Sequence, residues 1–137
     1  MNRIDFQEIS ELRLRESKAL LAAGFSEGAY YLAGYAVECA LKACIARRTQ
    51  EHDFPEKESR KYFSHDLQDL MGFAKLDVQL ERSLSVNPVM KANWIIVKNW
   101  SEESRYEKKK TIQEAVELLK AIEDRLRGLL PWIQLHW

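Results

Sequence analysis

The sequence lacks three features that would narrow its function at once: an excess of charge of either sign, an unbroken apolar stretch of membrane-spanning length, and a glycine-rich phosphate loop. Its 137 residues carry 21 Lys and Arg against 21 Asp and Glu. No global basic field therefore draws the chain to nucleic acid, and any such site must be local. The length fits a single domain over residues 1–137 with a core of its own.

Cysteine is also scarce. Cys39 and Cys44 are the only two, and on one helix they stand about 140° apart around the axis. They cannot form a disulfide with each other without unwinding that helix, so we expect buried thiols in a reducing compartment. The N-terminal stretch MNRIDFQEIS has no apolar signal region, and Glu38 and Lys42 interrupt the only long apolar run. We expect a cytoplasmic protein that has no membrane partner.

The chain is organised around one stretch, Gly28 to Arg48, which reads GAYYLAGYAVECALKACIARR. Between residues 29 and 46 only Gly34, Glu38 and Lys42 are not apolar. A helix that is apolar all round is a buried, central one, and its many small residues let neighbouring helices approach closely. We therefore predict that this helix forms the core of a helical bundle.

Glu38 and Lys42 are the first functional clue, because they stand at i and i+4 on one face of this helix. Exposed, such a pair contributes only about 0.2–0.5 kcal/mol, whereas either charge buried alone costs roughly 3–5 kcal/mol. The two side chains must satisfy each other, or face a polar crevice or a subunit interface. The structural alternative is an ion pair at a seam of the bundle; the functional one has Lys42 facing a phosphate or a partner carboxylate.

Four further helices complete the expected fold, over about residues 5–23, 65–75, 88–100 and 109–130, with another turn or two over 77–85. No stretch alternates with the period of a strand. The third helix should bury Leu67, Leu70, Met71 and Ala74; the fourth carries Val89, Ala92, Ile95, Ile96 and Trp100. The prediction is an all-α, up-and-down bundle of about five helices.

Helix ends are marked by side chains that can cap them. The expected N-caps are Asp5 (with Glu8 in capping-box spacing), Ser26, Ser64 and Asn87 (followed by Pro88). The last helix should carry Ile112 through Leu129 in regular 3.6 periodicity and end at Pro131. After it, residues 131–137 (PWIQLHW) form an apolar tail that we expect to dock on the bundle or on a second subunit.

Four pieces in this order resemble the HEPN domain (higher eukaryotes and prokaryotes nucleotide-binding), a small up-and-down helical bundle. The pieces are AYYLAGYAVECALKA, then SHDLQDL, then NWSEESRYE, and a final amphipathic helix. The resemblance covers nearly the whole chain. It implies one of three roles: a ribonuclease, often a toxin, whose site forms across a homodimer; the partner of a small nucleotidyltransferase, as in toxin–antitoxin pairs; or a non-catalytic module that binds nucleotides or scaffolds a complex.

The ribonuclease motif of that family, Arg-x(4–6)-His, is incomplete here. Arg105 takes the Arg position, but no His follows it before the last helix. Cleaving RNA through its 2′-hydroxyl requires a group with a near-neutral pKa, which Lys or Tyr supplies poorly. The spacing recurs from Arg47 to His52 and from Arg60 to His65, as expected by chance in a chain with several Arg. We therefore assign no catalytic residue.

His65 followed by Asp66 could belong to a metal-dependent phosphohydrolase, but that class needs more His and Asp ligands than the chain supplies. No Ser-His-Asp set or Cys-His zinc spacing is present either, and we predict no metal and no cofactor. We expect His65 in the first turn of the third helix, with Asp66 favoured there by the helix dipole. The resemblance implies that His65 closes a crevice containing Glu38 and Lys42.

The only dense basic and aromatic cluster is Trp100, Arg105, Tyr106 and the lysines 108–110. Such a cluster can stack a base and hold phosphates. The alternative is a solvated start to the last helix, with Arg105 paired to a neighbouring Glu; three lysines in a first turn oppose the helix dipole and favour an anionic neighbour.

The leading prediction is a non-enzymatic, homodimeric HEPN-like module. It binds a nucleotide, an RNA phosphate or a nucleotidyltransferase partner through Lys42, His65, Arg105 and Tyr106, and the supporting residues are Glu38, Asp66, Trp100 and Lys108. Two alternatives stay open. One is a metal-independent ribonuclease toxin that uses Arg105 with His65 or another proton carrier, and the other is a purely structural interaction module.

Overall fold

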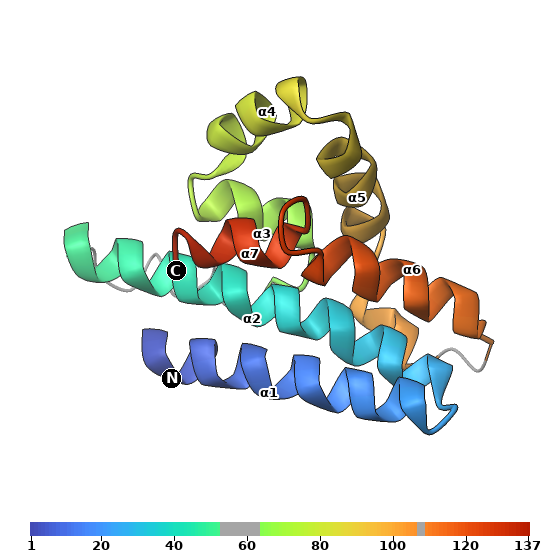
Figure 1. Ribbon diagram of the computed structural model, residues 1–137. Helices are drawn as coiled ribbons and strands as arrows, with labels where there is room; N and C mark the ends of the chain where they lie inside the picture. The colour runs from blue at the N-terminus through green and yellow to red at the C-terminus, as the bar shows by residue number, and fades with distance from the viewer. Residues whose placement is uncertain (53–63, 107–108) are drawn as a thin grey trace.

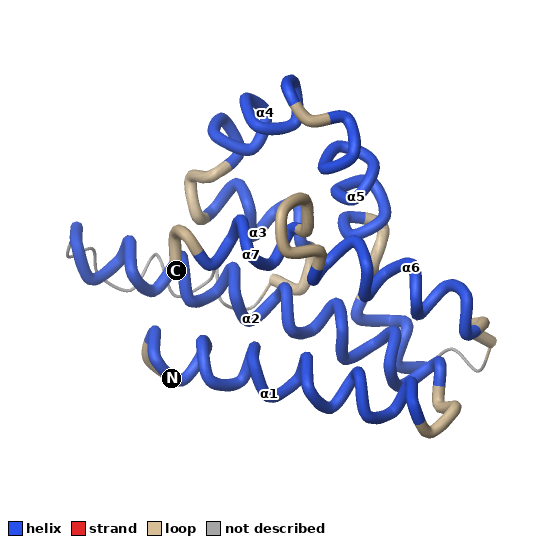
Figure 2. Tube along the Cα trace, viewed as in Figure 1, coloured by secondary structure: helices blue, strands red, loops and turns tan. Residues whose placement is uncertain are grey.

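The computed structural model describes residues 1–52, 64–106 and 109–137, with residues 50–52 as backbone only, and its described part is all-α (Figures 1 and 2). The prediction of an all-α bundle is confirmed. The α-helices are α1 (Arg3–Ala22), α2 (Ser26–His52), α3 (Leu67–Phe73), α4 (Asp77–Val86), α5 (Pro88–Lys98), α6 (Ile112–Glu123) and α7 (Leu129–Gln134), and a short 3₁₀ helix, η2 (Glu102–Tyr106), lies between α5 and α6.

Helix α2 is the centre of the bundle, as its composition predicted. It contacts α1, α3, η2, α6 and α7, and every residue from Ala36 to Ala46 is buried. It begins at Ser26 and reaches His52, so it extends beyond Arg48, where the stretch singled out in the sequence ends. Figure 1 shows α1 lying along one side of α2, with α6 and α7 on the other.

The hairpin of α1 and α2 is held by close backbone approach. Gly24 turns the chain with a φ of 89°, a conformation that favours glycine. Along the pair, the Ser10 hydroxyl donates to the Ala36 carbonyl at 2.7 Å and the Ser17 hydroxyl donates to the Ala29 carbonyl at 2.6 Å. Both serines are fully buried, so these bonds satisfy polar groups that would otherwise be unpaired inside the core.

Three predicted caps were wrong by a few residues. Helix α1 is capped by Asn2, whose side chain accepts from the Asp5 amide in a reciprocal capping box. Ser26 lies inside α2 and donates to the Lys110 carbonyl at 2.6 Å instead of capping the helix. Helix α3 is capped by Asp66, so His65 precedes that helix and does not lie in its first turn. For α1 and α3, two polar residues close in sequence could serve as the cap.

Helices α4 and α5 meet at Asn87, which caps α5 through the Met90 amide at 3.0 Å, with Pro88 in the first turn as predicted. Figure 1 shows this pair projecting from the side of the bundle opposite α1. Helix α3 buries the four residues predicted for it. Helix α5 buries Met90, Trp94 and Val97, whereas Val89, Ala92, Ile95 and Ile96, which the sequence analysis named on this helix, are exposed.

The predicted last helix is two helices, because Pro131 does not end a helix but lies in the first turn of α7. A proline inside a continuous helix would clash with the carbonyl four residues earlier, so the chain must break upstream of it. It does so at Asp124, whose side chain accepts from the amides of Leu126 and Arg127 at 3.0 Å. Leu126 falls in this break and is 83% exposed.

The apolar tail docks on its own bundle: Ile133 is fully buried, and the Trp137 carbonyl accepts from Arg3 and Gln7 at 2.8 and 3.0 Å. No helix in the described ranges is both long and apolar enough to cross a membrane.

Candidate functional site

Glu38 and Lys42 lie inside the protein, with only 1% and 7% of their surfaces exposed. The Lys42 ammonium donates to the Glu38 carboxylate at 3.1 Å. The charges therefore satisfy each other, which is the structural alternative that the sequence left open. The other oxygen of Glu38 lies 3.1 Å from Nδ1 of His65.

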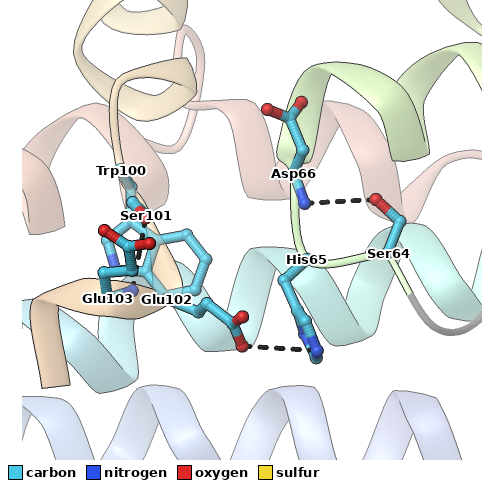
Figure 3. Close-up of a pocket in the computed structure, with 7 residues that line it drawn as sticks. All are labelled: Ser64, His65, Asp66, Trp100, Ser101, Glu102 and Glu103. Carbon is cyan, nitrogen blue, oxygen red and sulfur yellow. Dashed lines mark hydrogen bonds and ion pairs between the residues drawn. The ribbon is translucent and has the colours of Figure 1, made fainter.

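His65 connects this buried pair to the surface. Its Nε2 lies 3.3 Å from a carboxylate oxygen of Glu102 on η2, and the side chain is 41% exposed. Only an imidazole protonated on both nitrogens can donate to Glu38 and Glu102 at once. Figure 3 shows His65 and Glu102 reaching toward each other from two different chain segments. Lys42, Glu38, His65 and Glu102 form one continuous series of contacts, which we call the polar relay.

A pocket of about 270 Å³ lies beside the outer end of the polar relay (Figure 3). It is lined by Ser64, His65, Asp66, Trp100, Ser101, Glu102 and Glu103. Asp66 is already used as the cap of α3, where it accepts from the Asp69 amide at 2.9 Å. Among the lining residues that the structure describes, three are carboxylates and none is a lysine or arginine, so this lining attracts cations and hydrogen-bond donors and repels phosphate.

Trp100 holds the segment before η2 against α2. It is 3% exposed, and its ring stacks on Tyr31 with 6.1 Å between centroids. Gly34 makes this possible, because a Cβ at that position would overlap the indole. Within the described residues, Trp100 Nε1 and the Ser104 hydroxyl are buried without a hydrogen-bond partner. Each such group costs about 1–3 kcal/mol, so this turn is the least well satisfied part of the site.

Arg105 and Tyr106 lie on the surface at the end of η2. The Arg105 side chain is fully exposed, and its pKa is raised above the ordinary value first by a hydrogen bond to Tyr31 and then by Tyr106. Its guanidinium lies 4.7 Å from the centre of the Tyr106 ring. Among the described residues no carboxylate forms an ion pair with Arg105, so the predicted pairing to Glu102 or Glu103 is not made: Glu102 faces His65.

The lysines that follow η2 are only partly described. Lys108 lies outside the described residues, as do the side chain of His52 and all of Arg60, so the remaining Arg–His spacings are not placed. Lys110 lies 3.5 Å from Glu114 and 4.5 Å from the centre of the Tyr30 ring. This contact uses part of the basic cluster in packing against the start of α2.

The two cysteines are free and buried on α2. Burial raises the pKa of each thiol to about 12. Neither is a reactive thiolate near neutral pH. In the part of the chain that is described, no group of three or more His, Cys, Asp or Glu side chains is arranged to hold a metal ion.

The predicted site residues thus form two groups instead of one. Glu38, Lys42 and His65 come together in the polar relay, while Arg105 and Tyr106 lie outside it on the surface and Trp100 is buried in the core. Sequence reasoning missed Glu102, Tyr31 and Gly34. The available signal was Gly34 itself, because a glycine in the middle of a buried helix marks a place where another group approaches the backbone closely.

Comparison with known proteins adds nothing to this geometry. No family model, curated protein or solved structure matches the chain. The resemblance to HEPN domains stays a prediction from sequence pieces, and the function is argued below from the site itself.

Proposed function

We propose that this protein is a non-enzymatic helical module that binds a nucleotide or an RNA phosphate at the surface formed by Arg105 and Tyr106. The observation that carries the proposal is the state of Arg105: an exposed guanidinium whose pKa is raised by a hydrogen bond to Tyr31 and which makes no ion pair within the described residues. A positioned guanidinium of this kind suits the two-pronged geometry of a phosphate.

Tyr106 supplies the second half of the surface. Tyr106 is 73% exposed and the guanidinium covers one face of its ring, so the other face remains available to a base. Stacking on an aromatic ring contributes about 1–3 kcal/mol per base in single-stranded nucleic-acid binding. Lys42 is not a direct ligand in this proposal, because Glu38 already occupies it inside the core.

The pocket beside Trp100 constrains where the phosphate sits. Glu102 and Glu103 make that pocket electronegative, so the anionic part of a ligand belongs on Arg105 and only groups that donate hydrogen bonds belong near the pocket. His65 then contributes indirectly, by holding Glu102 in place.

The test is a thermal-shift and calorimetry panel with inorganic phosphate, AMP, ATP and a short single-stranded RNA. A ligand at a hundred times its dissociation constant stabilises the fold by about 2.7 kcal/mol, which is readily measured. We expect Arg105→Ala to weaken binding at least about tenfold and Arg105→Lys to weaken it less, since Lys keeps the charge but not the fork.

Arg15→Ala is the matched control, because Arg15 is an exposed arginine on α1. It should bind like the wild type. Binding that survives intact in Arg105→Ala, or that is lost equally in the control, would remove Arg105 as the ligand-binding residue.

The second candidate is a metal-independent ribonuclease, favoured by a different observation: His65 is partly exposed beside a pocket, and a buried carboxylate contacts its Nδ1. An imidazole oriented by a carboxylate is the usual arrangement of a general base. Glu102, however, faces Nε2 and would have to swing away first.

This candidate requires that purified protein cleave RNA and that His65→Ala abolish the cleavage. We expect intact RNA on a gel after incubation with the wild type. Cleavage that depends on His65 would replace the binding proposal with the enzymatic one.

A further inference from the structure

An ionic contact attaches η2 to the segment before α3. Nε2 of His65 lies 3.3 Å from a carboxylate oxygen of Glu102, and the two side chains come from separate chain segments (Figure 3). On the other side of the ring, Nδ1 of His65 lies 3.1 Å from Glu38 on α2. His65 therefore links the core to η2, and imidazole is the side chain that ordinarily changes its charge between about pH 5 and 8.

The number of protons on His65 decides whether Glu102 is attracted or repelled. A ring protonated on both nitrogens donates to Glu38 and to Glu102 at once, whereas a neutral ring has one N–H. Glu38 is only 1% exposed and cannot turn to water, so this N–H stays on Nδ1. Nε2 then presents a lone pair to a carboxylate, and the two acceptors repel each other. The Glu102 side chain is 34% exposed, so it is free to turn toward solvent.

The charged groups that surround the ring come from α2, from η2 and from the start of α3. They are Glu38, Lys42, Asp66, Glu102 and Glu103. Lys42 is already paired with Glu38 inside the core, and Asp66 is held as the cap of α3. Of these groups, Glu102 is the one that both contacts the ring and is partly exposed. A change in the charge of the ring therefore acts on η2.

The packed position of η2 carries a cost that the ionic contact offsets. Among the described residues, Trp100 Nε1 and the Ser104 hydroxyl are buried without a hydrogen-bond partner, and water would satisfy both if η2 moved away from α2. The stacking of Trp100 on Tyr31 and the hydrogen bond from Arg105 to Tyr31 oppose that movement. Losing the ionic contact removes one of the opposing interactions and shifts the balance toward the hydrated position.

We propose that His65 is a pH-dependent switch that holds η2 against α2 when its ring is protonated and releases η2 when its ring is neutral. The packed state belongs to the acidic side of the transition and the released state to the alkaline side. Arg105 and Tyr106 are on the same short helix, so the switch also sets the position of the ligand surface proposed above. This consequence alone rests on the proposed function.

The experiment measures, by nuclear magnetic resonance, how strongly the Trp100 indole N–H is protected from exchange with water between about pH 5 and 8. Comparison with the exchange rate of free indole at each pH removes the ordinary pH dependence of exchange. We expect the protection to fall at least about tenfold as the pH rises, with the midpoint at which the His65 ring resonances titrate in the same sample. No ligand is present, so the result does not depend on the proposed function.

Two variants should remove this pH dependence. In Glu102→Gln, the amide accepts from a protonated Nε2 and donates to a neutral one, so the Trp100 N–H should stay protected at every pH. His65→Gln removes the titrating ring, so the protection should no longer change with pH. Circular dichroism melts verify that both variants fold.

The matched controls are Glu103→Gln, which neutralises the neighbouring carboxylate in the same pocket, and His136→Gln, which removes the other histidine whose side chain the structure describes. Both should respond to pH like the wild type. The proposal is overturned by protection that is constant in the wild type, by a midpoint different from that of His65, or by a pH response that persists in His65→Gln or Glu102→Gln. Loss of the response in Glu103→Gln or His136→Gln would overturn it as well.

Discussion

The two cations that the sequence singled out, Lys42 and Arg105, occupy opposite environments. Lys42 lies in the core with its charge neutralised by Glu38 at 3.1 Å, whereas Arg105 lies on the surface beside Tyr31 and Tyr106 and has no described carboxylate as a partner. The first charge belongs to the fold and the second is open to a ligand. Availability, and not the presence of a positive side chain, decides which residue can bind an anion.

The difference arises in the backbone that carries each residue. Lys42 is on α2, where every neighbouring position is buried and a charge must bring its own partner. Arg105 is on a 3₁₀ helix of five residues, which exposes most of its side chains. Substitutions in α2 and substitutions in η2 should therefore affect the protein differently, and each can be tested by itself.

The largest effect should follow from Glu38→Ala. This change leaves the Lys42 ammonium buried without a carboxylate and releases His65, so we expect the free energy of unfolding to fall by about 3–5 kcal/mol in urea titrations. A loss below about 1 kcal/mol would mean that Lys42 reaches water, and the contrast with Arg105 would disappear.

A double variant sharpens the same point. Glu38→Leu with Lys42→Met replaces both charges by side chains of similar size, and such replacements of a buried pair are often neutral or stabilising. We expect it to recover most of the stability that Glu38→Ala loses. Failure to recover would indicate that the contact between Glu38 and His65 holds the fold together.

Gly34→Ala should disturb the contact between α2 and Trp100, which precedes the helix that carries Arg105. The new methyl group overlaps the Trp100 indole, so either the ring or the chain before η2 must move, at a cost of about 1–3 kcal/mol. Tryptophan fluorescence should shift toward that of an exposed indole.

Gly72→Ala is the matched control, since it also places a methyl group on a helix but meets no atom within 4 Å. Alanine is preferred over glycine inside helices, so the control should be neutral or stabilise by up to about 1 kcal/mol. Equal destabilisation by the two variants would show that the Trp100 contact is not what makes Gly34 necessary.

The burial of the two cysteines on α2 should make the free energy of unfolding depend on pH at high pH. Cys39 and Cys44 have their pKa raised by burial from 9.0 to about 12, so the folded state keeps protons that the unfolded state has released. Their contribution to stability is complete below pH 9 and is lost between pH 9 and 12, at about 1.4 kcal/mol per pH unit for each thiol. Cys39→Ala with Cys44→Ala should flatten this slope in unfolding curves, and an unchanged slope would assign it to other groups.

Whether a feature of the structure could be predicted from the sequence depends on how far apart in the chain the interacting residues lie. The burial of α2, the Glu38–Lys42 pair and the Asn87–Pro88 start of α5 rest on neighbours a few residues apart, and all three are confirmed. The choice of Asp66 over Ser64 as a cap was misjudged because both residues can accept the same bond. The break before α7 was missed because apolar periodicity continues through it.

Contacts between side chains far apart in the chain could not be predicted from the sequence. His65 and Glu102 meet only because α3 and η2 both pack on α2, and no local pattern indicates that contact. The same packing separates Arg105 from the polar relay, so residues that looked like one site divide into two. The resemblance to HEPN domains stays a prediction, and it could not place the side chains of its segments relative to one another.

Arg105→Ala should have the smallest effect on stability. A small effect would show that Arg105, unlike the buried pair of Glu38 and Lys42, is not needed to hold the fold together. The guanidinium is exposed and makes no described ion pair, so we expect the free energy of unfolding to change by less than about 0.5 kcal/mol, the usual range for surface positions. Urea titration of this variant beside Glu38→Ala measures both regions on one scale. If Arg105→Ala destabilised the protein as strongly as Glu38→Ala, its bond to Tyr31 would be a structural anchor for η2, and Arg105 would join Lys42 among the charges that serve the fold.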